Sequence, residues 1–451
     1  MGLWVTLIIF ALLMLGIFKK VDIRVLLLGL SFLTLCILTA MRGSVLGDAT
    51  TGSAFLDIFA YIVNYFSSNL GATALPVILV FAYVEVLTRI HATDMMAYLI
   101  SIPIRKVKSV YLSVAIVVLI GSFLRIPTGS GPALIALMLA LFYPMLRSLG
   151  CPNATAAAAM IVWSNAVLGP ADPSCVIASQ VMGIKVNYAL WFTETQLPFM
   201  LFSLPILIIL FVVLAAILDK KEPEEVAASA VEALKRPDCP VFFAILPLLP
   251  LFFMIVFSPL MIASVSMNVG TACILSMAIT LLSIIATSRE KGVVQENLKL
   301  FFSSLGNNIT SIGMMMMFGM LFATCMSQLG GLNMIADGIR SAHLPDMITL
   351  LLLCAFTAIL GLVLSSFYGT LSIGLSLAAS FTGLAGLSES VLCYLVLTSV
   401  FAGTCCAPAG VGPNMIAAKT GVPTTTIIKR IAAPIWITLI ISVIISGLLW
   451  G

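Results

Sequence analysis

Charged side chains are scarce in this chain of 451 residues, where Asp, Glu, Lys and Arg together make up only 9%. Soluble globular proteins carry about 25%. Hydrophobic residues reach 61%, and a soluble fold of this composition could not cover its own surface with polar groups. The natural solvent of such a chain is lipid, and we expect an all-α polytopic membrane protein.

Several chemical groups are also missing or too few to build a site. The two histidines and ten scattered cysteines form no C-x-x-C pair and no cluster at metal-ligand spacing. The net charge of +4 is too small to suggest nucleic-acid binding. No Walker loop, G-x-S-x-G elbow or H-E-x-x-H helix occurs. We therefore expect no enzyme, no bound metal or cofactor, and no nucleic-acid partner.

Ten apolar stretches are long enough to cross a membrane. They lie at about 3–18, 25–41, 72–90, 153–183, 193–217, 242–257, 263–286, 307–328, 391–422 and 432–450. The first of them lacks a basic segment before it and a small-residue cleavage site after it. We expect this stretch to be retained as a membrane span rather than removed as a signal peptide.

Two further apolar regions, at about 108–146 and 346–387, are too long for one helix and contain polar, glycine-bearing interruptions. Two of the spans, 153–183 and 391–422, are broken in their middle. The four interruptions lie at 125–132, 365–372, 168–174 and 407–414. Glycine and proline free backbone polar groups that lipid cannot satisfy, so such backbone must be buried in protein or line a wet cavity. We expect two re-entrant hairpins and two broken helices.

The two halves of the chain resemble each other. Pro170-Ala171 matches Pro408-Ala409, and Gly183 matches Gly421, both at a spacing of 238 residues. Each half can be divided into two spans, a short amphipathic helix, a third span, an amphipathic stretch, an interrupted region, a broken span and a last span. We expect residues 1–218 and 241–451 to be two repeats, joined by a hydrophilic cytoplasmic linker at 219–240.

An odd number of crossings in each repeat would invert the second repeat relative to the first. Each repeat would then contain about five transmembrane helices and one re-entrant hairpin. With the N-terminus outside, 18 Lys and Arg residues fall on the cytoplasmic side, and only Arg42, Lys185 and Arg340 fall on the outer side. This positive-inside bias supports inverted-topology repeats, with both termini in the periplasm.

Inverted repeats with broken helices are typical of secondary transporters, which bind substrate near the membrane midplane. The N-termini of half-helices offer free N–H groups and a positive dipole end to a carboxylate. The candidate substrate ligands are Thr128, Gly129, Ser130, Gly131, Asn165, Gly169, Pro170, Ser366, Tyr368, Gly369, Thr370, Thr404, Pro408, Gly410 and Asn414. The alternative is that these interruptions are kinks and hinges in tight helix packing.

Arg125 is the one basic residue expected at membrane depth, where an arginine costs at least about 2.5 kcal/mol unless it is paired or hydrated. Its planar fork suits a substrate carboxylate. Alternatively, it forms a structural ion pair with Asp172, or it reaches the membrane surface. Asp172 lies in the first broken span and could carry the coupling ion, a proton or sodium, or could serve only to neutralise Arg125.

Four segments are similar to the DcuC family of bacterial anaerobic C4-dicarboxylate transporters. They are Arg89 through Met96, Thr128 through Gly131, Leu168 through Gln180, and Ala407 through Pro434. The resemblance covers about residues 55–440. The chain departs from the family pattern at Cys405-Cys406, where relatives tend to have a polar or basic residue, and at Arg125, in a hairpin that is usually neutral.

The resemblance implies a homodimeric carrier of the bacterial inner membrane, with a scaffold domain and a moving transport domain that works as an elevator. It implies fumarate, malate or succinate as substrate, with proton-linked uptake, exchange or succinate efflux. We therefore expect a secondary active transporter of C4-dicarboxylates. The alternatives are a transporter of another organic anion, such as a tricarboxylate or sugar acid, and an anion channel. Polar residues gathered at the interruptions favour a closed site with alternating access.

Overall fold

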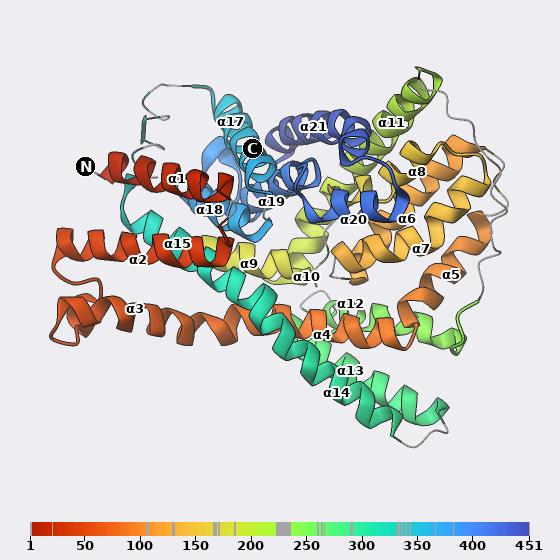
Figure 1. Cartoon of the computed structure of the whole chain (residues 1–451), viewed down its shortest axis with the longest axis horizontal. Helices are drawn as coiled ribbons and strands as arrows, with labels where there is room; N and C mark the ends of the chain where they lie inside the picture. The colour runs from red at the N-terminus through yellow and green to blue at the C-terminus, as the bar shows by residue number, and fades with distance from the viewer. Residues whose placement is uncertain are drawn as a thin grey trace.

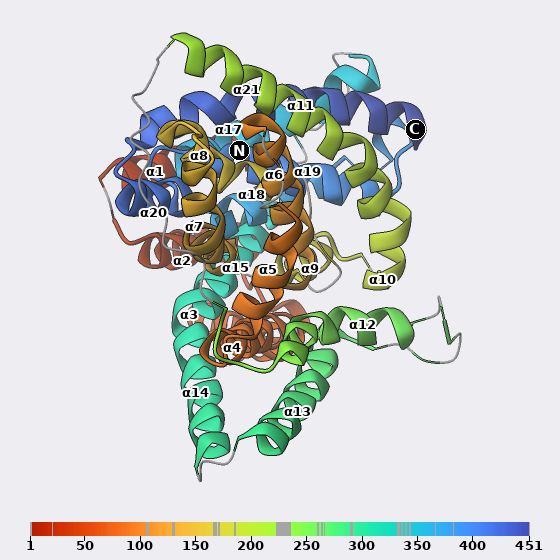
Figure 2. The same ribbon diagram turned by 90° about the vertical axis from the view of Figure 1, so that its right-hand side faces the viewer.

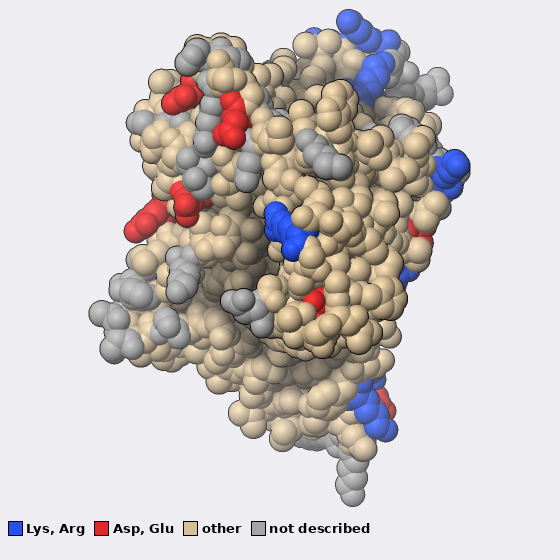
Figure 3. Space-filling view, turned by 90° about the vertical axis from the view of Figure 1, so that its left-hand side faces the viewer, with Lys and Arg blue, Asp and Glu red and all other residues tan. Residues whose placement is uncertain are grey.

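In the computed structural model, all the regular secondary structure among the described residues is helical (Figure 1). The described residues are 2–19, 21–104, 107, 109–128, 131–165, 169, 172–184, 186–221, 236–258, 261–262, 265, 267–288, 292–331, 334, 337–338, 341, 344–365, 367–381 and 383–450. Figure 3 shows how few charged side chains reach one face of the molecule, where large areas carry none.

The first half of the chain forms α1 (Gly2–Phe18), α2 (Ile23–Arg42), η1 (Gly47–Ala49), α3 (Ala54–Asn69), η2 (Leu70–Ala74), α4 (Leu75–Arg89), α5 (Ala92–Ile104), α6 (Val110–Thr128), α7 (Gly131–Ser148), α8 (Asn153–Ala159), η3 (Val162–Asn165), α9 (Pro173–Met182), α10 (Tyr188–Trp191), η4 (Phe192–Gln196) and α11 (Leu197–Lys221). The second half forms η5 (Val241–Leu248), α12 (Leu249–Val256), α13 (Val269–Thr287), α14 (Val293–Asn308), η6 (Ile309–Gly313), α15 (Met314–Gln328), α17 (Asp346–Leu364), α18 (Phe367–Ala379), η7 (Leu384–Gly386), α19 (Glu389–Cys405), α20 (Val411–Thr420) and α21 (Thr424–Leu449). The elements η2, η4 and η6 are single turns of π-helix.

Polar side chains begin several of the long apolar helices. The Asp22 carboxylate accepts a hydrogen bond from the Arg24 backbone N–H at 2.8 Å and caps α2. Hydrogen bonds from the Arg24 side chain and backbone lower the pKa of Asp22 to about 2. Asn268 caps α13 and Ser388 caps α19 in the same way. These caps satisfy N–H groups that the first helical turn leaves without an intrahelical partner.

Six helical segments among the described residues are long and apolar enough to cross a membrane. They are Arg24–Arg42, Tyr188–Lys221, Val269–Thr287, Val293–Gln328, Asp346–Leu364 and Thr424–Leu449. The helices Leu75–Arg89 and Ala92–Ile100 make a seventh if this pair, bent by 72°, is one span. The prediction of an all-α polytopic membrane protein is confirmed. The ten spans, the re-entrant hairpins and the division into repeats stay predictions, because the other apolar helices are only 10–17 residues long.

Helix boundaries recur along the chain at a nearly constant spacing. The run α3–η2–α4 has elements of 16, 5 and 15 residues, and α14–η6–α15 repeats these three lengths 239 residues later. The helices α9 and α20 are both ten residues long, and each ends at a left-handed glycine, Gly183 or Gly421. The helices α6 and α17 both have 19 residues.

The two matching runs, α3–α4 and α14–α15, lie antiparallel. The Arg89 side chain, at the end of α4, forms an ion pair of 2.6 Å with Glu296, near the start of α14. At the opposite end, Gln328 of α15 donates a hydrogen bond to the Tyr61 hydroxyl of α3 at 2.9 Å. Figures 1 and 2 show α3, α4, α13 and α14 at one end of the molecule, with α11 and α21 at the other.

Contacts between the two halves come in reciprocal pairs. The helix α2 packs against α15, and its counterpart by position, α13, packs against α4. Likewise, α7 contacts α20, and α18 contacts α9. The second arm of each interrupted region thus lies against the half-helix that follows the break in the other half of the chain.

The helices α17 and α19 cross so closely that a side chain would not fit at Gly403. A Cβ atom there would lie 1.9 Å from the Ala358 carbonyl oxygen. We expect Gly403→Ala to destabilise the protein by about 1–3 kcal/mol, because backbone must move to relieve this overlap. Gly29→Ala, on α2 with no atom within 4 Å of the added carbon, is the matched control. Thermal unfolding of the two purified variants tests this, and equal melting temperatures would contradict it.

Candidate functional site

A buried ion pair joins the first two interrupted regions. Arg125 lies in the last turn of α6, and its guanidinium pairs with the carboxylate of Asp172, the residue that caps α9. Only 4% of Arg125 and 1% of Asp172 are exposed. Charges removed from water in this way are stable only as a close, well hydrogen-bonded pair.

Local sequence explains why the carboxylate stands at this place. Asp172 is followed by Pro173 at the first helical position, and its side chain accepts a hydrogen bond from the Ser174 backbone N–H at 2.9 Å. Aspartate at the cap and proline in the first turn are both favoured at a helix start. The positive end of the α9 dipole also stabilises the carboxylate.

Gly169 brings the break in the first span against the end of α6. It is buried, and a Cβ atom there would lie 2.8 Å from the Ile126 carbonyl oxygen. The Gly169 carbonyl oxygen accepts a hydrogen bond from the Asp172 N–H at 2.9 Å. The absence of a side chain at Gly169 therefore allows the backbone before Asp172 to approach the residue next to Arg125.

The second half of the chain completes the surroundings of Arg125. Its guanidinium carbon lies 5.8 Å from the centroid of the Phe401 ring, on α19. The Phe367 ring, at the start of α18, lies 4.4 Å from that of Phe401. The Ser164 hydroxyl, before the first break, lies 3.2 Å from the Cys405 sulfur, before the second. The two interrupted apolar regions, 108–146 and 346–387, and the two broken spans, 153–183 and 391–422, together form the four interrupted regions of the chain. Residues from all four therefore come together around the Arg125–Asp172 pair.

This arrangement offers a cation in a low-dielectric setting, which strengthens its attraction for an anion. The Phe401 ring adds a cation–π contact to the guanidinium. The planar Arg fork binds carboxylates in a bidentate manner. No three His, Cys, Asp or Glu side chains come together as a metal site within the part of the chain that the structure describes.

Burial and pairing bear on the alternatives for Arg125. The Arg125 side chain does not extend away from the protein, because it is enclosed by protein and paired with Asp172. The depth of the hairpin tip in the membrane stays a prediction. The ion pair is present, and it places the cation and the candidate coupling residue in direct contact.

Other predicted ligands lie at the same interruptions. Gly131 begins α7, and Gly369 and Thr370 are buried in the first turn of α18. Gly129, Ser130, Pro170 and Ser366 lie outside the described residues, as do the side chains of Thr128, Asn165 and Tyr368.

The residues of the second break have partners of their own. The Thr404 hydroxyl donates to the Val400 carbonyl oxygen within α19 at 2.9 Å. Gly410 is buried at the cap of α20, whereas Pro408 is exposed. The Asn414 amide donates to the Pro408 and Gly410 carbonyl oxygens at 3.0 and 2.9 Å. Asn414 therefore holds the loop of the break in shape.

Sequence reasoning did not identify Phe401, Phe367, Ser164 or Cys405 as neighbours of the pair. A phenylalanine in an apolar helix has the same appearance whether it packs in the core or lies over a guanidinium. The one available signal was that Phe401 precedes Cys405 by one helical turn and so shares its face.

Comparisons with known proteins give a consistent result. The family model described as DcuC, C4-dicarboxylate anaerobic carrier, matches residues 1–449. The probable anaerobic C4-dicarboxylate transporter DcuC of Vibrio cholerae is 23% identical over 406 residues, which cover 88% of this chain and 86% of that protein. The anaerobic C4-dicarboxylate transporter DcuC of Escherichia coli K12 is 22% identical over 425 residues, which cover 92% and 90%.

A solved structure shares the fold. The crystal structure of the Alcanivorax borkumensis YdaH transporter aligns with a TM-score of 0.59. The alignment covers 95% of this chain and 98% of that one at 17% sequence identity.

Proposed function

The chain belongs to the DcuC family of C4-dicarboxylate anaerobic carriers, and from this premise we propose that it is a secondary active transporter of fumarate, malate or succinate. It is a multi-pass membrane transporter and not an enzyme. One observation carries the proposal: a buried arginine, already paired with a carboxylate, lies where all four interrupted regions meet.

The Asp172 carboxylate pairs with the Arg125 guanidinium in the way that a carboxylate of the substrate would. A dicarboxylate that takes the guanidinium must displace Asp172, which leaves a buried carboxylate without its partner at a cost of several kcal/mol. A proton or sodium ion that joins Asp172 removes this cost. Substrate and coupling ion would then bind together, as symport requires.

We also propose that the two halves are inverted repeats, 1–218 and 241–451, joined by the cytoplasmic linker 219–240. The repeated helix lengths, the antiparallel packing of α3–α4 on α14–α15 and the reciprocal contacts support this proposal. A pseudo-two-fold axis in the membrane plane produces this combination.

We further propose an elevator-type division into a scaffold and a transport domain, which the family resemblance implies. The scaffold would contain α2 to α4 and α13 to α15, and the transport domain would contain α6 to α9 and α17 to α21, with the Arg125–Asp172 pair inside it. We propose that the protein works as a homodimer in the bacterial inner membrane with both termini in the periplasm. The positive-inside distribution of its basic residues supports this orientation.

A panel of carboxylates tests the substrate class. We expect fumarate, malate and succinate to raise the melting temperature of the purified transporter, with citrate, sugar acids and acetate giving smaller shifts at equal concentration. Repeating the panel with and without sodium separates sodium from proton coupling.

Two results would contradict the proposal. A larger shift with a tricarboxylate or sugar acid would indicate another organic anion. Proteoliposomes that pass succinate at a rate that does not saturate, with no counterflow, would indicate an anion channel.

A further inference from the structure

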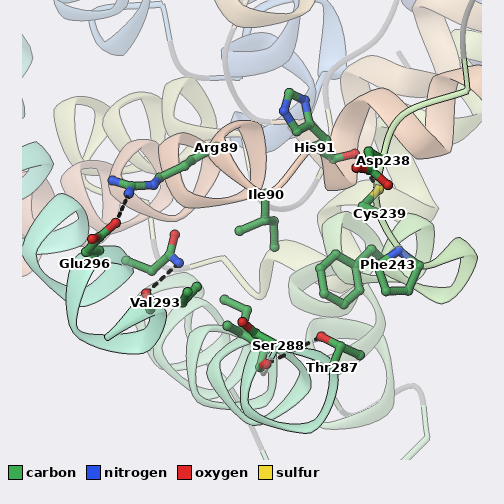
Figure 4. A pocket seen from close by; sticks show the side chains of 13 residues that line it. Arg89, Ile90, His91, Asp238, Cys239, Phe243, Thr287, Ser288, Val293 and Glu296 are labelled. Atoms are coloured by element: carbon green, nitrogen blue, oxygen red, sulfur yellow. Dashed lines mark hydrogen bonds and ion pairs between the residues drawn. The ribbon is translucent and has the colours of Figure 1, made fainter. Parts of the chain in front are cut away.

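A second candidate site is lined by residues that include neither Arg125 nor Asp172. A cavity of about 420 Å³ opens where the end of α4, the segment before η5, the end of α13 and the start of α14 meet (Figure 4). Its volume falls within the range of small-molecule sites. The lining residues are Arg89, Ile90, His91, Asp238, Cys239, Pro240, Phe243, Ile284, Thr287, Ser288, Val293, Glu296 and Asn297.

The lining carries an excess of negative charge. Arg89 and Glu296 form an ion pair of 2.6 Å at one side of the cavity, and Asp238 adds a further carboxylate on another side. The His91 ring points out of the cavity in Figure 4, and its Nδ1 lies 2.7 Å from the Asp94 carboxylate. Since two carboxylates and one guanidinium line the cavity, it disfavours a dianion and favours a cationic group.

A buried acceptor without a partner lies in the same lining. Asn297 is 1% exposed, and its side-chain N–H₂ donates to the Val293 carbonyl oxygen at 2.9 Å. This bond fixes the orientation of the amide, and the Oδ1 atom then has no hydrogen-bond partner. A buried acceptor left unsatisfied is unfavourable, so the site favours a ligand that donates a hydrogen bond to Asn297.

The surroundings of the cavity suit the rest of a lipid molecule. Phe242 and Ile245 on η5, and Leu282 and Ile285 on α13, are exposed large hydrophobic residues. They belong to the same two elements that contribute Phe243 and Ile284 to the lining. Acyl chains could therefore lie along these helices while a headgroup occupies the cavity.

We propose that this cavity binds the ammonium headgroup of an aminophospholipid, of which phosphatidylethanolamine is the simplest. The ammonium donates hydrogen bonds to Asn297 Oδ1 and to the neighbouring Glu296 carboxylate, and the phosphate faces Arg89. The Asp238 carboxylate, across the cavity, adds to the negative potential that attracts the ammonium. Cys239 Sγ, 3.5 Å from the His91 carbonyl oxygen, ties the end of the linker to the bend between α4 and α5. A bound headgroup would hold these connections together, whatever substrate the protein transports.

Native mass spectrometry of the purified full-length protein with added lipids tests the proposal. We expect phosphatidylethanolamine to remain bound, and phosphatidylglycerol, which has no ammonium, to dissociate. Phosphatidylcholine should bind more weakly, because its quaternary ammonium cannot donate a hydrogen bond to Asn297. Equal retention of phosphatidylethanolamine and phosphatidylglycerol would overturn the proposal.

Asn297→Leu removes the acceptor and should weaken phosphatidylethanolamine binding about tenfold or more. Asn307→Leu, at an exposed position of the same helix, is the control and should leave binding unchanged. Asp238→Asn, at an exposed position of the linker end, should also weaken binding and carries little risk of misfolding. Full lipid binding in both cavity variants would refute the site. If free ethanolamine stabilises the protein as much as the lipid does, the cavity binds a soluble amine, and the proposal of a lipid ligand is overturned.

Discussion

Replacing Arg125 by alanine is expected to abolish binding of succinate and fumarate by the purified transporter. A buried charge-assisted pair contributes about 2–5 kcal/mol when one partner is truncated, so the affinity should fall by at least about 30-fold. The same change leaves Asp172 buried without its partner and should destabilise the protein by about 3–5 kcal/mol. Isothermal titration and thermal unfolding measure the two effects.

A double variant separates binding from stability. Arg125→Ala with Asp172→Ala removes both charges, so it should recover much of the lost stability while binding stays absent. Arg125→Lys keeps the charge but loses the planar fork and should bind with intermediate affinity. Succinate affinity that is unchanged in a folded double variant would show that Arg125 is only a structural partner of Asp172.

The sequence was sufficient to predict the class of fold and the places where helices are interrupted. Glycine and proline concentrate at Pro127 to Pro132 and at Pro408 to Pro413, and such residues change the backbone by local rules that need no tertiary information. The number of membrane crossings could not be predicted from such local rules. Whether α6 and α7 return to the same side depends on what they pack against, which composition does not encode.

In the continuous helical runs at 54–89 and 293–328, the helix boundaries differ from those expected from the sequence. From the sequence we expect, in each half, a short amphipathic helix followed by a separate span that begins at about 72 or 307. In the structure, each junction is a π-helical turn within one continuous helical run. The Asn69 and Asn308 amides donate to carbonyl oxygens one turn earlier, at 2.8 and 2.9 Å. Since these polar groups are satisfied within their own helix, they do not end it.

The candidate site was predictable only in its charged part. Arg125 and Asp172 stand out because an ionisable group at membrane depth is costly and needs a partner. The aromatic neighbours Phe367 and Phe401 carry no such signal, since phenylalanine is favourable anywhere in an apolar helix. Their contact joins residues from two different interrupted regions, and such contacts depend on how the four regions meet in space.

Asp172→Asn is expected to preserve exchange of one dicarboxylate for another and to abolish the response of net uptake to a pH gradient. The amide oxygen of asparagine can still accept the hydrogen bond from the Ser174 N–H, so the start of α9 should persist. Asparagine takes up no proton, so displacement of residue 172 by substrate is no longer linked to proton binding. Proteoliposomes with an imposed pH gradient measure net uptake, and counterflow of labelled succinate measures exchange.

The direction of the effect follows from linkage. If one proton enters with each dicarboxylate, a pH one unit lower outside should raise accumulation by the wild type about tenfold. The variant should accumulate the same amount at every gradient. Asp219→Asn is the matched control, because Asp219 is also buried and pairs with Arg430 at 3.4 Å but lies outside the interrupted regions. Its pH response should match the wild type, whereas a wild-type response in Asp172→Asn would exclude Asp172 as the coupling residue. A sodium gradient that drives uptake by the wild type but not by Asp172→Asn would instead identify sodium as the ion that replaces Arg125.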